Sequence, residues 1–102
     1  MKLSEQGFYK VPNLFSLGIL YPNLKSLDLS HNHLLSLEGQ AMISCLPNLE
    51  VLNVSFNLLC NMEEIYAFDG FEKLRELDMR GNRKLIWEQM NMTALIGRLL
   101  MH

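Results

Sequence analysis

The 102-residue sequence predicts an α/β solenoid, with short parallel strands on a concave face and short helices on the convex face. The first observation is a leucine that recurs every 25 residues, at Leu24, Leu49, Leu74 and Leu99. The second is an alternation of apolar and polar residues after each of the first three leucines, which is typical of a strand with one buried face. The third is a capped, helix-like stretch in the second half of each unit. Such units bury their apolar faces by stacking on one another.

The first half of each unit predicts a strand that is followed by a turn. The three strand segments cover residues 26–30, 51–55 and 76–80. Asn32, Asn57 and Asn82 come shortly after them. A buried amide at this position satisfies backbone groups in the turn and continues such bonds into the next unit. An apolar residue there would leave buried groups unpaired, at a cost of about 1–3 kcal/mol each.

The second half of each unit predicts a short helix behind the sheet. Ser36 and Asn61 are good N-caps for helices over residues 37–43 and 62–68. Glutamates in the first turn of both stretches favour the same interpretation because they complement the helix dipole. The third helix is expected over about residues 87–95.

The repeat spacing also predicts how the chain is divided. Complete units are expected at residues 24–48, 49–73 and 74–98. Residues 1–23 are expected to form a degenerate N-terminal repeat or cap. Its expected core contacts are Leu14, Leu17 and Ile19. Residues 99–102 would begin a truncated repeat or end a C-terminal capping helix. The chain is either a piece of a longer array or a small protein with improvised caps, and bare strand edges would allow self-association.

These units resemble the leucine-rich repeat, whose pattern is Leu-x-x-Leu-x-Leu-x-x-Asn-x-Leu. The first unit reads Leu24-x-x-Leu27-x-Leu29-x-x-Asn32-x-Leu34, and the units from Leu49 and Leu74 follow it. The third unit has Lys84 where a leucine is expected, which indicates an irregular repeat. The resemblance is strongest to intracellular arrays, such as phosphatase regulators, tubulin-folding cofactor E relatives and ciliary proteins. It implies a non-catalytic module that binds a protein partner on its concave face.

Composition argues against several other classes of protein. A net charge of −2 gives no reason to expect nucleic acid or an anionic membrane as a partner. The two cysteines, Cys45 and Cys60, are too few for a disulfide framework and are expected to be buried thiols. Neither a signal-peptide-like segment nor a transmembrane stretch is apparent, which favours the cytoplasm. An extracellular receptor-type array is the alternative, in which Asn53 and Asn91 would be glycosylation acceptors.

The sequence offers no set of residues for catalysis, and neither a cofactor nor a metal ion is expected. It contains no nucleophile–base pair, glycine-rich phosphate loop or metal motif. His31 and His33 bracket Asn32, but a zinc site would need further ligands, so turn histidines are the simpler interpretation.

Residues that face outward from the predicted strands and turns are the candidates for partner binding. They are Asp28, Ser30, His31, Asn53, Ser55, Phe56, Asp78 and Arg80. Phe56 is the best single candidate, since an exposed aromatic beside polar neighbours resembles a binding hot spot; the alternative is that it packs against a neighbouring loop. Asp28 and Asp78 flank Asn53 and either form an acidic stripe for a basic peptide or only aid solubility.

Overall fold

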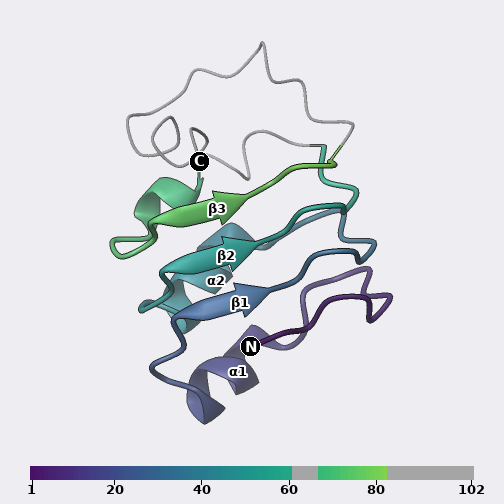
Figure 1. Ribbon diagram of the computed structural model, residues 1–102. Coiled ribbons are helices and arrows are strands. Elements are labelled where there is room, and N and C mark those ends of the chain that lie inside the picture. The colour runs from purple at the N-terminus through teal and green to yellow at the C-terminus, as the bar shows by residue number, and fades with distance from the viewer. Residues whose placement is uncertain (61–66, 83–102) are drawn as a thin grey trace.

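A computed structural model describes residues 1–60 and 67–82 of the chain. Its centre is a parallel sheet with the strand order β1 (Ser26–Asp28), β2 (Val51–Asn53) and β3 (Glu76–Asp78) (Figure 1). Ser26 pairs with Val51, and Val51 pairs with Glu76. The prediction of parallel strands in a 25-residue register is therefore confirmed, although each strand has three residues where five were expected.

Short helices lie together on one side of the sheet (Figure 1). They are α1 (Leu14–Leu20), α2 (Gly39–Cys45) and the 3-10 helix η1 (Ala67–Gly70). α1 begins after Asn13, whose side chain accepts a hydrogen bond from the backbone N–H of Ser16 at 3.2 Å. This contact satisfies one of the free amides in the first turn.

The start of α2 differs from the prediction that Ser36 caps a helix over residues 37–43. Glu38 has a left-handed backbone (φ 48°), so the helix begins only at Gly39. The Ser36 hydroxyl accepts a hydrogen bond from the backbone N–H of Glu38 at 3.3 Å, which closes a turn before the helix. Most of the helix expected over residues 62–68, and the whole of that over 87–95, lies outside the described residues, as does Lys84.

The core lies between the sheet and the helices. It is built from the apolar residues of the repeat pattern, which include Leu27, Leu29, Leu34, Leu37, Met42, Leu46, Leu49, Leu52, Val54, Leu59, Phe68, Phe71, Leu74, Leu77 and Met79. In the N-terminal region Leu14 is buried and Leu17 packs against this core, as predicted. Ile19 is 63% exposed, so its expected core contact is wrong.

Three buried asparagines join the turns of successive repeats. Asn57 Nδ2 donates to the carbonyl oxygens of Leu29 and Val54, both at 3.0 Å, and Asn57 Oδ1 accepts from the N–H of Leu34 at 3.1 Å. Asn32 and Asn82 make equivalent bonds. The predicted role of these amides is confirmed, because each satisfies backbone groups in its own turn and in the preceding one.

The N-terminal segment pairs in parallel with β1. The N–H of Leu3 donates to the carbonyl of Asp28 at 2.7 Å, and the N–H of Asp28 donates to the carbonyl of Met1 at 2.9 Å. Farther along the same segment, the backbone amides of Gln6 and Phe8 donate to Asn32 Oδ1, at 2.9 and 3.1 Å. Phe8 therefore takes the position in its turn that Leu34 takes in the next one. The two residues are 26 apart in the sequence, so a search for repeats at a fixed spacing of 25 does not detect this equivalence.

Candidate protein-binding face

The sheet has one face that the helices do not cover. The middle residue of each strand is buried, so the residues on either side of it point away from the core. We call this surface the open face and define it by Ser26, Asp28, Val51, Asn53, Glu76 and Asp78. Its side chains are exposed or half-buried, as expected for the concave surface in the sequence prediction.

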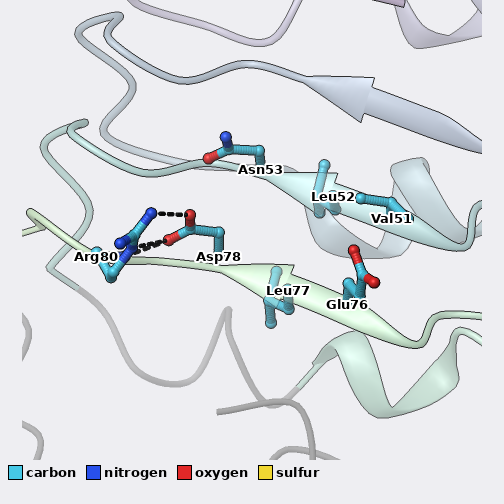
Figure 2. A pocket seen from close by; sticks show the side chains of 7 residues that line it. All are labelled: Val51, Leu52, Asn53, Glu76, Leu77, Asp78 and Arg80. Carbon is cyan, nitrogen blue, oxygen red and sulfur yellow. Dashed lines mark hydrogen bonds and ion pairs between the residues drawn. The ribbon is translucent and has the colours of Figure 1, made fainter. Parts of the chain in front are cut away.

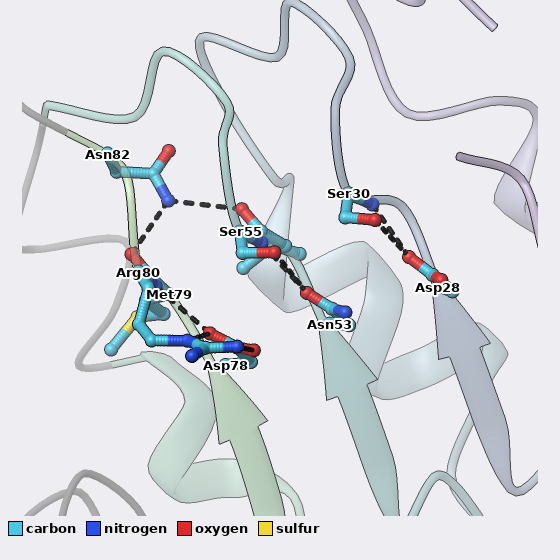
Figure 3. Close-up of polar contacts among 9 residues, drawn as sticks. Asp28, Ser30, Asn53, Ser55, Asp78, Met79, Arg80 and Asn82 are labelled. Carbon is cyan, nitrogen blue, oxygen red and sulfur yellow. Dashed lines mark hydrogen bonds and ion pairs between the residues drawn. The ribbon is translucent and has the colours of Figure 1, made fainter. Parts of the chain in front are cut away.

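Polar side chains form a row at the ends of the three strands (Figure 3). Asp28 Oδ1 accepts hydrogen bonds from the backbone N–H and the hydroxyl of Ser30, at 2.9 and 2.6 Å. Asn53 Oδ1 accepts the same pair of bonds from Ser55, at 3.0 and 2.7 Å. These short-range bonds hold the carboxylate of Asp28 and the amide of Asn53 in fixed orientations on the open face.

Ser30 and Ser55 are not surface residues. They are 5% and 3% exposed, so the prediction that they face a partner is wrong. Sequence alternation placed them outward, but the strand ends before them and their hydroxyls turn back to Asp28 and Asn53. Their contribution to the face is to orient those two side chains.

Asp78 is neutralised by a residue of its own turn. Arg80 Nε and Nη2 donate to the two carboxylate oxygens of Asp78, at 3.0 and 2.8 Å (Figure 2). These hydrogen bonds hold the pKa of Asp78 below its ordinary value and raise the pKa of Arg80. The predicted acidic stripe from Asp28 to Asp78 is therefore interrupted at β3.

A groove crosses the open face between β2 and β3. Its volume is about 370 Å³, and its polar lining consists of Asn53, Glu76, Asp78 and Arg80 (Figure 2). Val51 adds an apolar side chain to it. The groove brings together three of the predicted binding residues, whereas Asp28 lies on the neighbouring strand, paired with Asn53.

His31 and Phe56 stack on each other beside the open face. Their ring centroids lie 4.6 Å apart and their planes differ by 10°. A Cβ atom on Gly81 would lie 2.4 Å from Phe56 Cδ1, so the phenyl ring rests against the backbone of Gly81. Phe56 nevertheless stays 49% exposed. Phe56 therefore packs against the neighbouring turn, as one interpretation of the sequence expected, and remains accessible to a partner, as the other required.

Sequence reasoning missed several other exposed apolar side chains. Tyr9 stacks on His33 with a centroid distance of 5.5 Å, and Leu35 and Leu58 are exposed. They occupy variable positions of the repeat, where the pattern carries no information about burial.

Cys60 is exposed and Cys45 half-buried, so the prediction of buried thiols is wrong for Cys60.

The described part of the chain shows neither a metal-binding group of side chains nor a membrane-spanning helix. Within residues 1–60 and 67–82, no three side chains of His, Cys, Asp or Glu are grouped so that they could hold a metal ion. None of the helices described is long and apolar enough to cross a membrane.

Comparison with known protein families identifies the fold. The family model described as "Leucine rich repeat" matches residues 22–83, which is more than half of the chain. The chain belongs to the leucine-rich repeat family. The family fold is a solenoid, and the parallel sheet agrees with it. Leucine-rich repeat domains generally mediate protein–protein interactions, and no catalytic family is indicated.

Several curated leucine-rich repeat relatives match this chain over part of their length. The mouse "Centrosomal protein of 72 kDa" is 42% identical over 82 residues, which is 78% of this chain and 12% of that protein. Human "Leucine-rich repeat-containing protein 36" is 37% identical over 82 residues, or 78% of this chain and 10% of that protein. Human "Leucine-rich repeat-containing G-protein coupled receptor 5" is 42% identical over 60 residues, or 59% and 6%. The matched part thus spans about a tenth of the first two relatives.

Proposed function

We propose that this leucine-rich repeat chain is a non-catalytic module that binds a protein partner on the open face and on the adjoining His31–Phe56 stack. The observation that carries the proposal is an exposed aromatic ring held rigidly beside fixed polar side chains. Aromatic anchors next to satisfied polar groups are typical of binding hot spots, because they supply apolar area at little entropic cost. The exposed and half-buried members of the predicted binding set form this surface: Asp28, His31, Asn53, Phe56, Asp78 and Arg80.

A comparison of variants in an affinity capture tests this proposal. The open-face variant combines Asp28→Ala, Phe56→Ala and Asp78→Ala, and the control combines Ser16→Ala, Ser44→Ala and Glu72→Ala, exposed residues outside the open face. Quantitative mass spectrometry of captured proteins should show specific partners lost from the open-face variant and retained by the control. Equal retention by folded samples of both variants would contradict the proposal.

A second candidate function is structural, in which these repeats form one segment of a longer array. The supporting observation is that the matched region makes up only 10–12% of two relatives that match 78% of this chain. Sedimentation and thermal melting of residues 1–102 separate the two functions. A cooperative monomer supports the independent module, whereas an aggregated or non-cooperative sample supports the structural segment.

We also propose a cytoplasmic location, with the secreted array as the alternative. The names of the relatives include a centrosomal protein and a receptor. Asn53 lies on the open face, so a glycan there would obstruct that surface. Fractionation with a glycosidase shift assay tests the proposal: a glycosylated, secreted product would contradict it.

A further inference from the structure

We infer that the open face binds an extended protein segment that places a basic side chain on Asp28 and an apolar or aromatic side chain against the His31–Phe56 stack. The inference rests on the proposed function, because it names the chemistry of the partner for the same surface. Three features of the surface support it: its charge, its free hydrogen-bonding groups and the spacing between Asp28 and the stacked rings.

Asp28 differs from the other carboxylates of the open face in its charge balance. Asp78 is paired with Arg80 at 2.8 Å, and Glu76 is paired with Arg75 at 3.0 Å. Asp28 has no cation within 4.0 Å among the residues that the structure describes. Lys2 is the register partner of Asp28 on the N-terminal segment but makes no ion pair with it within 4.0 Å. The half-buried carboxylate, held on a fixed turn, is therefore open to a direct ion pair with a cationic side chain of a partner.

The hydrogen bonds of Asp28 and Asn53 leave one polar atom of each side chain for a ligand. Ser30 occupies Oδ1 of Asp28, and Ser55 occupies Oδ1 of Asn53. Within the described part of the chain, Asp28 Oδ2 and Asn53 Nδ2 have no hydrogen-bond partner, and the two residues are paired in adjacent strands. Together they present an acceptor for a guanidinium or ammonium group and a donor for a peptide carbonyl.

The apolar anchor lies at a distance that suits an extended segment. His31 follows Asp28 by three residues, so their Cα atoms are separated by at most about 11 Å. Alternate side chains of an extended peptide lie about 7 Å apart on one side of its backbone. A partner with an Arg-x-Phe arrangement therefore reaches the carboxylate of Asp28 and the stacked rings at the same time.

A titration with defined peptides tests the inference on the full 102-residue chain. The probe is Ac-Ala-Arg-Ala-Phe-Ala-NH₂, and the matched neutral probe carries citrulline in place of arginine. We expect the arginine peptide to shift the amide resonances of Asp28, Ser30, His31 and Phe56 in a saturable manner. Citrulline should weaken the affinity by about two- to fivefold, the range for a solvent-accessible ion pair, and added salt should reduce this difference.

Two conservative variants identify the residue responsible. Asp28→Asn should remove the preference for arginine while keeping the turn, because Asn53 makes the same bonds to Ser55. Asn53→Asp should strengthen arginine binding, because Asp28 shows that a carboxylate fits this turn. Phe56→Leu should weaken both peptides equally.

Specific outcomes overturn the inference. Equal affinity for arginine and citrulline, a preference that survives Asp28→Asn, or no saturable shift with either peptide would each contradict it. Partner loss from the open-face variant in the capture experiment, combined with any of these results, would retain the proposed function and reject only a basic–apolar partner.

Discussion

Asn57 shows what a single residue contributes, because its one side-chain amide bonds to four backbone groups in two successive turns. Its surroundings are buried, so water cannot replace those bonds. The 25-residue recurrence of asparagine was enough to predict this role from sequence, since few other side chains offer a donor and an acceptor in so small a volume.

Asn57→Leu should lower the free energy of unfolding by at least about 2 kcal/mol, because it leaves at least two buried backbone groups without a partner. Urea denaturation followed by circular dichroism measures the change. Asn23→Ala, at an exposed site, is the control and should stay within about 0.5 kcal/mol of the unmodified chain. A loss of similar size in both variants would contradict the assigned role.

Gly81 supports Phe56 by lacking a side chain. Glu5, His31 and Phe56 adopt left-handed conformations in their own turns, so the backbone alone does not demand glycine at this point. Gly81→Ala should displace the phenyl ring, because the new Cβ would lie 2.4 Å from Cδ1. Loss of the ring-current shift on the His31 ring protons in NMR spectra would report the displacement.

Gly7→Ala is the matched control for this substitution. Gly7 has a similar φ of 71°, but an added Cβ meets no atom within 4 Å. It should carry only the backbone penalty of about 1–2 kcal/mol and leave the His31 signals unchanged. An unchanged His31 spectrum in Gly81→Ala as well would show that the glycine does not position Phe56.

The ion pair of Asp78 predicts a change in titration. Arg80→Gln should raise the pKa of Asp78, because the hydrogen bonds from Arg80 lower it in the folded chain. A lowered folded-state pKa stabilises the fold above the pKa of the unfolded chain, and this contribution disappears as the pH falls through the folded-state value. Unmodified chain and variant should therefore differ in stability near neutral pH and converge in acid. Carboxyl NMR titration checks the pKa, and an unchanged Asp78 value would contradict the assignment.

At the scale of elements, strands were more predictable than helices. Alternation around Leu27, Leu52 and Leu77 placed the three strands that the structure describes, since period two directly reports which face is buried. Helix starts depend on backbone conformations that the apolar pattern does not encode, such as the left-handed Glu38 that delays α2. The segment over residues 1–5 was missed because its spacing departs from 25 and its key position holds Gln6 in place of asparagine.

The helices contact each other at two glycines, Gly18 and Gly70, which differ in how well they would tolerate an added side chain. A Cβ on Gly18 would lie 2.5 Å from the backbone oxygen of Cys45, whereas one on Gly70 would lie 2.9 Å from the flexible end of Ile43. Gly18→Ala should therefore destabilise the fold more than Gly70→Ala, despite the gain of about 1 kcal/mol in helix propensity. Urea denaturation of both variants checks the order, and a more stable Gly18→Ala chain would show that α1 and α2 are not closely packed.

At the scale of the whole molecule, the sequence indicated which surface faces outward more accurately than which side chains are accessible on it. Repeat spacing located the outward face, and Asp28, Asn53 and Phe56 are accessible on it or beside it. Spacing could not reveal that Ser30 and Ser55 turn inward, that Arg80 neutralises Asp78, or that Gly81 supports Phe56. Each of these depends on side-chain contacts made only after the repeats have stacked.

Site-specific photo-crosslinking tests whether a protein binds on the open face and the adjoining His31–Phe56 stack. A photoreactive phenylalanine analogue is introduced at Phe56 in one sample and at Ser44, an exposed residue of α2 outside the open face, in another. After irradiation in cells, we expect discrete higher-mass adducts from position 56 and few from position 44. Adducts that form mainly from position 44, or equally from both positions, would contradict it.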